Sequence, residues 1–202
     1  MHINIQLSHL KAAAHGAAKN DIRGYLNGVC IQATATETRY IGTDGHALVA
    51  VRHGASNDVP GRVEIVIPRD VIDAIKASKR DLSQRWILDE AGGAEMYKLV
   101  SPSGVIRPFA APAGRFPDYT RVIPETLTGE AGQLSAALTA RVQKAADTLI
   151  GKAAYLYTTY NGAAGAALIV TTHPDFVAVV MPTRPPKDYA PPASAWARAV
   201  PA

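Results

Sequence analysis

Asp44 and His46 come nearest to a chemical site in this sequence. A carboxylate two residues from an imidazole can form an acid–base pair or supply two ligands to a metal ion. No second histidine stands at metal-ligand spacing from His46, and the single cysteine, Cys30, has no thiol partner. We therefore expect no metal and no cofactor, and residues 42–45 taken alone are an ordinary turn.

The sequence lacks the motifs of the common enzyme classes. It contains no Gly-rich phosphate loop followed by Lys and Ser or Thr, and no Gly-x-Ser-x-Gly elbow. Cys30 follows Val29 in an apolar, strand-like run, which predicts a packed and reduced thiol. We expect no catalytic residues and therefore no enzyme.

Composition predicts a compact protein. Of 202 residues, 48% are hydrophobic and 19% charged, enough for one good core and a smaller second one. The formal charge of +4 suits a polyanionic partner but does not establish one. No apolar run approaches the roughly 18 to 20 residues of a membrane helix, and the start of the chain lacks an apolar signal region. We expect a cytoplasmic protein without membrane contact.

The elements that would position these residues follow a repeated order. Residues 3–7 alternate as a half-buried strand, Ser8 can cap a helix that runs to Lys19, and strands are expected at 25–33, 38–42 and 47–52. A second set begins with a strand at 62–67 and a helix from Pro68, whose apolar face holds Val71, Ile72 and Ile75. Its strands are expected at 86–88, 96–101 and 105–110. Two strand-helix-strands units thus form an internal repeat.

A third unit stands without a fourth. Residues 133–150 have apolar side chains at helical spacing, and strand-like runs follow at 153–159, 166–171 and 176–181. Asn161-Gly162 predicts a hairpin with a type I′ turn. Residues 186–202 are rich in Pro and predict an extended tail, which Trp196 could anchor to the body or to a partner.

Four short motifs resemble one family. They are Tyr-Leu-Asn-Gly at 25–28, Ile-Gly-Thr-Asp-Gly-His at 41–46, Ile-Val-Ile-Pro-Arg at 65–69 and Gly-Arg-Phe-Pro-Asp-Tyr at 114–119. In this order they resemble the middle domain of the bacterial DNA sliding clamp, the β subunit of DNA polymerase III. Val-Val-Met-Pro-Thr-Arg at 179–184 resembles the segment that closes the family's last domain.

The resemblance implies an α+β fold of the DNA-clamp (processivity) type. Residues 1–123 resemble the family's middle domain, residues 124–185 the second half of its last domain, and residues 186–202 form the tail. The chain would then hold about one and a half clamp domains, and the family's usual head-to-tail contact could not simply be assumed.

The resemblance also implies a pocket that holds a short peptide from a polymerase or another clamp-binding protein. Leu26, Leu48, Val179 and Met181 would give an apolar floor, and Gly45 would let a peptide backbone approach. Ala47 departs from the basic residue usual in the family, which implies the loss of one rim contact and a different partner specificity. The ten pocket residues implied by the motifs are Leu26, Thr43, Gly45, His46, Leu48, Pro124, Val179, Met181, Pro182 and Arg184.

The family's helices line a ring around DNA, and the helices expected here are net basic. Loose attraction to phosphates without base readout suits a protein that slides, although a solvated helix face would look similar. The candidate DNA-facing residues are Lys11, Lys19, Arg23, Lys76, Lys79, Arg80, Arg141, Lys144 and Lys152.

The resemblance implies a homo-oligomeric sliding clamp that encircles double-stranded DNA and tethers a polymerase or another replication or repair protein. A clamp loader would be a further partner. The alternative is an adaptor or decoy that captures clamp-binding peptides and never encircles DNA. Either role would suit a cellular or a phage-encoded protein, and the sequence does not distinguish the two.

Overall fold

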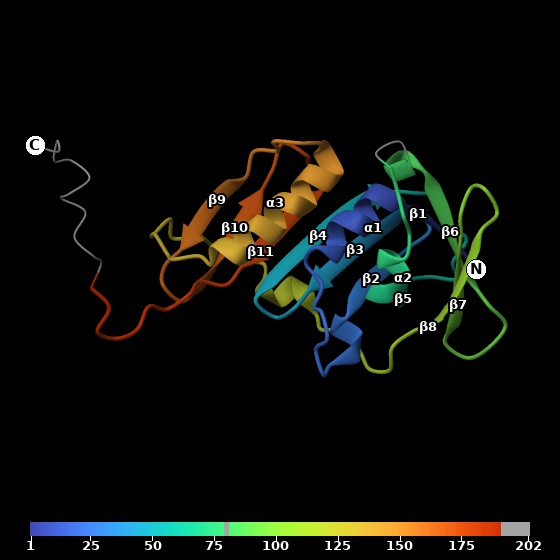
Figure 1. The fold of residues 1–202 in the computed structure, drawn as a ribbon, viewed down its shortest axis with the longest axis horizontal. Helices are drawn as coiled ribbons and strands as arrows, with labels where there is room; N and C mark the ends of the chain where they lie inside the picture. Colours follow the sequence, from blue (N-terminus) through green and yellow to red (C-terminus); the bar gives the residue numbers. More distant parts are fainter. Residues whose placement is uncertain (79–80, 191–202) are drawn as a thin grey trace, which may run out of the picture.

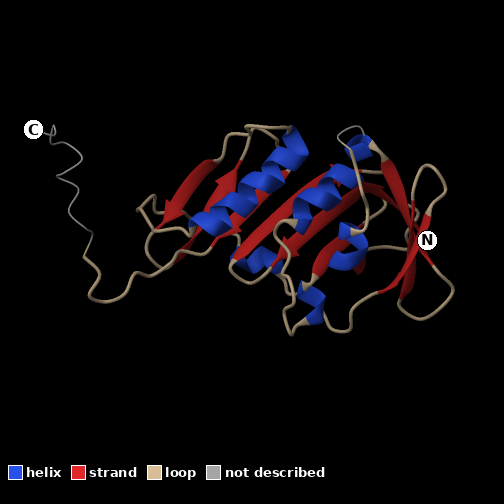
Figure 2. Ribbon diagram, viewed as in Figure 1, coloured by secondary structure: helices blue, strands red, loops and turns tan. Residues whose placement is uncertain are grey.

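A computed structural model describes residues 1–78 and 81–190 of the chain. Two of the candidate DNA-facing residues, Lys79 and Arg80, lie outside the described residues, and so does Trp196. Figures 1 and 2 show an elongated α+β molecule in which helices lie over long antiparallel sheets. No helix in the described part of the chain is long and apolar enough to cross a membrane.

The first two units have the same order of elements. The first consists of β1 (His2–Gln6), α1 (Leu7–Ala14), β2 (Gly28–Ala33), β3 (Glu37–Thr43) and β4 (Ala47–Gly54). The second consists of β5 (Val63–Pro68), α2 (Arg69–Asp73), β6 (Arg85–Glu90), β7 (Met96–Val100) and β8 (Ile106–Ala110). The repeated pattern expected from the sequence is therefore present.

The third unit contains one helix and three strands. It is formed by α3 (Ala136–Ile150), β9 (Tyr157–Asn161), β10 (Gly165–Val170) and β11 (Phe176–Val180). Three short 3₁₀ turns complete the described elements: η1 (Gly24–Leu26), η2 (Asp81–Ser83) and η3 (Tyr119–Val122).

The first two units exchange their first strands. β5 pairs with β2 of the first unit, and β1 pairs with β6 of the second. This gives a four-stranded sheet, β1-β6-β7-β8, and a seven-stranded sheet, β5-β2-β3-β4-β11-β10-β9. The third unit joins the larger sheet because β11 pairs antiparallel with β4, from Phe176 opposite Val51 to Val180 opposite Ala47.

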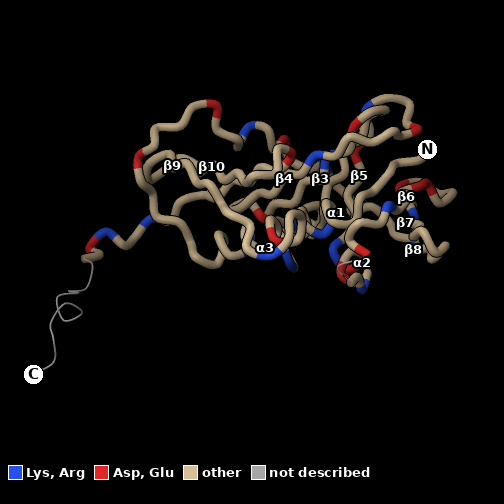
Figure 3. The backbone as a smooth tube through the Cα atoms, turned by 90° about the horizontal axis from the view of Figure 1, so that it is seen from above, with Lys and Arg blue, Asp and Glu red and all other residues tan. Residues whose placement is uncertain are grey.

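The helices lie along one side of the molecule. Viewed from above in Figure 3, α3, α1 and α2 follow one another along one side, and the strands β3, β4 and β5 lie behind them. α1 packs on both neighbouring helices and on β3 and β4. One face of the large sheet is therefore covered by helices, and the other face is available for loops and ligands.

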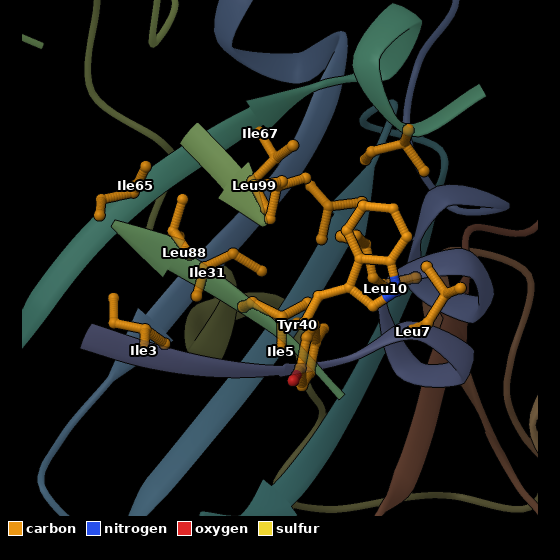
Figure 4. Packing of buried hydrophobic residues seen from close by; sticks show 14 of the residues in the cluster. Ile3, Ile5, Leu7, Leu10, Ile31, Tyr40, Ile65, Ile67, Leu88 and Leu99 are labelled. Atoms are coloured by element: carbon orange, nitrogen blue, oxygen red, sulfur yellow. The ribbon is translucent and has the colours of Figure 1, made fainter. Parts of the chain in front are cut away.

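The main core lies where the two exchanged units meet. Figure 4 shows Ile3 and Ile5 of β1 beside Leu88 and Leu99 of the small sheet, with Ile31 of β2 close to them. All five side chains are 0% exposed. Burying such side chains contributes about 1.5 to 3 kcal/mol each, so the core holds the two units together as one body.

The first helix is shorter than the sequence predicts. It ends at Ala14 and not at Lys19, and it begins at Leu7, so Ser8 lies inside it and bonds His9 and not the helix end. Gly16 follows the helix and lies against β3 and β4, where an added Cβ would come 2.4 Å from the Gly42 carbonyl oxygen. The close approach of the backbone to the sheet ends the helix there.

Further boundaries also differ from expectation, and the strand expected at 153–159 runs from Tyr157 to Asn161. Residues 24–26 form the 3₁₀ turn η1, so the strand begins at Gly28 and not at residue 25. Pro68 ends β5 and stands before the first helical residue, because its ψ of 147° is extended. The hairpin at Asn161 is present, but Asn161 belongs to β9 and the turn extends to the start of β10 at Gly165, so it is not a two-residue type I′ turn.

Candidate functional site

A cavity of about 190 Å³ opens on the face of the large sheet that the helices leave uncovered. Its floor contains Leu48 of β4 and Val179 of β11, which are opposite each other in the strand register and each 2% exposed. The lining residues come from four separate segments: Arg23, Leu26, Thr43, Gly45, His46, Ala47, Leu48, Pro117, Asp118, Tyr119, Val122, Val179 and Met181. We call this cavity the sheet pocket.

The turn between β3 and β4 forms one wall of the sheet pocket. The Asp44 carboxylate accepts hydrogen bonds from the backbone N–H groups of His46 and Ala47, both at 2.8 Å. The Thr43 hydroxyl donates to the Ala47 carbonyl at 2.7 Å and accepts from the Gly45 N–H at 3.1 Å. Gly45 has a φ of +89°, which favours glycine. The polar side chains of this motif are therefore used in building the turn.

Arg141 of α3 fixes the same turn from the helix side. Its guanidinium forms an ion pair with the Asp44 carboxylate. Burial acts to raise the Asp44 pKa, but the bond from Arg141 and the two backbone N–H groups lower it by more, so the net shift is downward. Asp44 therefore stays ionised at neutral pH and is a structural anion, not a proton donor.

The end of β11 completes the opposite wall. The Met181 N–H donates to the His46 carbonyl at 2.9 Å, which continues the β4–β11 pairing past the end of the strand. Met181 is 37% exposed, so its thioether is available at the rim of the sheet pocket. The pocket thus exists only where the first and third units meet.

A loop from the second unit lies across the uncovered face. Gly114 adopts a φ of +106° and packs on Tyr25, where an added Cβ would lie 2.7 Å from the ring. This brings Phe116 and Tyr119 into a cluster with Leu26 and Leu48. Asp118 begins η3 by accepting a bond from the Thr120 N–H, and this bonding to Thr120 lowers its pKa. The two motifs that are about seventy residues apart in sequence therefore line one pocket.

Searches against known proteins identify what the chain resembles. It is 30% identical to the β sliding clamp of Proteus mirabilis over 122 residues, which are 59% of this chain and 32% of that clamp. It is 29% identical to the β sliding clamp of Escherichia coli K12 over 124 residues, or 57% of this chain and 31% of that clamp. Over this region the chain is similar in sequence to the bacterial β sliding clamps. No model of a known protein family matches it, and the matched region spans about a third of the curated clamps' length.

Solved structures give the same fold over a longer stretch. The β subunit of DNA polymerase III from Pseudomonas aeruginosa superimposes with a TM-score of 0.68 and 17% identity, covering 91% of this chain and 66% of that one. A sliding clamp of the same organism bound to griselimycin superimposes with a TM-score of 0.67 and 18% identity, covering 91% and 65%. The chain therefore has the sliding-clamp fold, with about one and a half clamp domains.

The structure brings most of the motif-derived pocket residues together. Seven of the ten line the sheet pocket: Leu26, Thr43, Gly45, His46, Leu48, Val179 and Met181. The other three do not line it. Pro182 is paired with Leu134 in an isolated bridge, Arg184 is exposed, and Pro124 follows η3 beyond the pocket.

Sequence reasoning missed five lining residues besides Ala47: Arg23, Pro117, Asp118, Tyr119 and Val122. Pro117, Asp118 and Tyr119 belong to the Gly-Arg-Phe-Pro-Asp-Tyr motif, from which no pocket residue was predicted. The resemblance of this motif to the same clamp domain as the Ile-Gly-Thr-Asp-Gly-His motif was the available signal for a shared site.

The candidate DNA-facing residues are spread more widely than the sequence implies. Lys144 is on α3 and exposed, whereas Lys19, Arg23, Lys76 and Lys152 lie in loops next to the helices. Lys11 of α1 is only partly exposed, and its ammonium donates to the Ile75 carbonyl at 2.8 Å beyond the end of α2. Burial lowers the Lys11 pKa. Lys11 therefore links two helices.

A second, polar cavity of about 740 Å³ lies between the end of α1 and α3. It gathers four of the DNA-facing candidates, Lys19, Arg23, Arg141 and Lys144, and adds Arg69. Asp21 and Asp44 also line it, and both carboxylates bond guanidinium groups, of Arg23 and Arg141 respectively. The bond from Arg23 lowers the Asp21 pKa to about 2. We call this surface the basic concavity. Among the described residues, no cluster of three or more His, Cys, Asp or Glu could hold a metal ion.

Proposed function

We propose that the chain is a sliding-clamp-like processivity factor. It would hold a polymerase or another replication or repair protein by a short peptide in the sheet pocket, and it would act by binding and not by catalysis. The observation that carries the proposal is the convergence of seven motif-derived residues on one cavity of about 190 Å³. The resemblance to the β sliding clamps supports it.

The chemistry of the sheet pocket suits an apolar peptide side chain. Leu26, Leu48 and Val179 present buried aliphatic surface, and filling such a cavity removes a ligand's apolar atoms from water at about 25 cal/mol for each Å². Met181 is flexible and polarisable, so it can adapt to different side chains at the rim. Arg23 and His46 add polar groups beside this floor, which would orient the peptide.

The rest of the proposal concerns DNA and assembly. The basic concavity lies among the helices and borders the sheet pocket, with which it shares Arg23 and His46, so a chain could bind DNA phosphates next to a partner peptide. We assign residues 1–123 to a clamp domain and residues 124–185 to half of one. If six such domains surround a duplex, four chains would form the ring in the cytoplasm, and a loader would open it.

Two exposed methionines provide a matched test of the sheet pocket. Met181 is 37% exposed at its rim, and Met96 on β7 is 36% exposed elsewhere. We expect Met181→Ala to weaken the binding of griselimycin, the ligand named in one matched clamp structure, by roughly tenfold or more, because a contact of about 1.4 kcal/mol or more is removed. Met96→Ala should leave the dissociation constant unchanged in titration calorimetry. Equal affinity for all three proteins would remove the pocket from the proposal.

Encirclement is tested separately with DNA of two topologies. A clamp should be retained on closed circular DNA and lost from the same DNA after linearisation, because a ring can slide off an end. Equal retention on both forms, or on neither, would favour the adaptor that captures clamp-binding peptides without encircling DNA. The adaptor is a serious alternative because the matched region spans only about a third of the curated clamps.

A further inference from the structure

In each complete unit, the outer edge of the second strand is paired with the first strand of the other unit. β2 is covered by β5 through six residue pairs, and β6 is covered by β1 through five. The third unit has the corresponding strand, β9, but the described residues contain no strand on its outer side, and it is the end of the seven-stranded sheet. Figure 1 shows β9 at the margin of the molecule.

The backbone of β9 is partly open on that side. At one end, the Gly129 N–H donates to the Tyr160 carbonyl and the Gly162 N–H to the Glu130 carbonyl, so Tyr160 faces away from β10. Because backbone groups alternate along a strand, Thr158 also directs its N–H and C=O away from β10. The stretch from Leu156 to Thr159 therefore offers an unpaired hydrogen-bonding edge.

Large apolar side chains are exposed around this edge. Ile150 is 40% exposed at the end of α3, Tyr155 is 76% exposed and Tyr157 is 54% exposed. β9 itself, with the sequence Tyr-Thr-Thr-Tyr-Asn, carries neither a charge nor a proline. Because a two-fold interface brings each residue near its own copy, a neutral strand can pair with itself without like-charge repulsion.

The two edge strands of the small sheet, β1 and β8, are protected against such pairing. On β1 the outward N–H groups of His2, Asn4 and Gln6 donate to Asp58, Asn57 and Tyr40 respectively. On β8, the bonds at Val105 and Ala111 fix the alternation so that Pro108 faces the open side, where it has no N–H to donate.

The other end of the large sheet is protected in a similar way. The Arg69 N–H bonds the Asn27 carbonyl, so the alternation along β5 turns Glu64 and Pro68 outward. A charge and a proline are common devices against edge pairing. Of the sheet ends in the described part of the chain, β9 is therefore the one without such a device.

We propose that β9 pairs antiparallel with β9 of a second copy of this chain, across a two-fold axis at Thr158. Thr158 would then exchange N–H···O=C bonds with Thr158 of the partner subunit, and Tyr157 would stand opposite Thr159 of the partner subunit. The two large sheets become one continuous sheet. Such pairs would be the building blocks of the proposed ring, so this inference rests on the proposed function and adds to it the contact between two chains.

A charge-complementation experiment tests the interface. Tyr157 and Thr159 are both exposed, so charged residues there are compatible with the folded monomer. In size-exclusion chromatography with light scattering, we expect the wild-type protein to have a mass of at least twice the 21.3 kDa of one chain. The double variants Y157K/T159K and Y157E/T159E should each show half the wild-type mass, because four like charges would meet at the axis. An equimolar mixture of the two variants should recover the wild-type mass.

The control variant is Ile106→Lys, a charge added at the 59% exposed position of the proline-protected edge of β8, which should keep the wild-type mass. A monomeric wild-type chain, or double variants with the wild-type mass, would overturn the β9 interface. Griselimycin affinity is measured on the same variants. If affinity is kept and only the mass halves, the interface is supported independently of the sheet pocket, whereas a normal mass without griselimycin binding would contradict the proposed pocket and leave the interface in place.

Discussion

Arg141 joins three parts of the chain through one guanidinium group. It donates to the carbonyls of His15, Gly16 and Ala17 beyond the end of α1, and it forms the ion pair with Asp44. A guanidinium has five N–H donors, so these partners leave it little capacity for a phosphate. We therefore regard Arg141 as a residue that stabilises the junction between units, and Lys144, one helical turn further along α3, as the better DNA contact.

His9 and His15 should make the stability of the protein depend on pH. Burial is the main cause that lowers both pKa values to about 4, from an ordinary 6.5. Neighbouring groups add to this: His53 and His173 lie near His9, and Arg69, Lys144 and Arg141 near His15, while the acids Asp175 and Asp73 oppose it. Between pH 4 and 6.5 the unfolded chain binds more protons than the folded one, so stability is complete above pH 6.5 and is lost as the pH falls.

The expected loss is at most roughly 3 kcal/mol for each histidine across that range. Urea denaturation at pH 7 and at pH 4.5 would measure it. The variant H9Q/H15Q should have a flatter dependence of unfolding free energy on pH, whatever its stability at pH 7. An unchanged slope would mean that other groups cause the acid sensitivity.

The sequence motifs predicted those pocket residues that lie within a motif. Thr43, Gly45 and His46 sit in one turn, so their closeness follows from the sequence alone. Val122 belongs to no such segment, and it lines the sheet pocket because the chain around η3 packs on Tyr25 and Leu26. Contacts of this kind depend on tertiary packing, which spacing along the chain does not encode.

At the scale of elements, the contact between α1 and β3 depends on two glycines, Gly16 after the helix and Gly42 on the strand. An added Cβ at Gly42 would lie 2.0 Å from the Ala13 carbonyl oxygen, which is backbone and cannot move independently of the helix. Gly42→Ala should therefore lower the unfolding free energy by at least about 2 kcal/mol, as overpacking does. Gly54→Ala at the end of β4 is the control, because an added Cβ there meets nothing within 4 Å. Thermal melting curves of both variants measure this difference in stability. Equal melting midpoints would contradict the prediction, because they would mean that α1 moves away from the added methyl group without cost.

The strands were more predictable than the helices. Alternating and continuous apolar runs predicted the strands among β2 to β8, because strands that pack on one or both faces carry β-branched and other apolar residues in a clear pattern. Ala17 and Ala18 have good helix propensity, but Gly16 before them has poor propensity and lies against the sheet, which allows no further turn. The exchange of β1 and β5 between units leaves no mark on local sequence, so it was not predicted and only the structure shows it.

For the whole molecule, the two faces separate two kinds of binding. The sheet pocket is mainly apolar and faces away from the helices, whereas the basic concavity lies among them. Figure 3 shows Lys and Arg on and between α3, α1 and α2. Binding through phosphates depends on the number of cations in contact and on salt, and not on base sequence. Arg23 and His46 line both cavities, but charge changes at residues that line only the basic concavity should affect DNA without affecting the sheet pocket.

The double variant K19E/K144E tests this separation, because both residues border the basic concavity and are exposed. Its affinity for duplex DNA should fall, and the slope of log affinity against log salt concentration should shrink by about one for each lost phosphate contact. Arg115→Glu reverses an exposed charge in the loop on the opposite face and should leave the slope unchanged. Fluorescence anisotropy at several salt concentrations measures both. If the two variants lost affinity equally, attraction would come from net charge alone, and the helix side would have no special role in holding DNA.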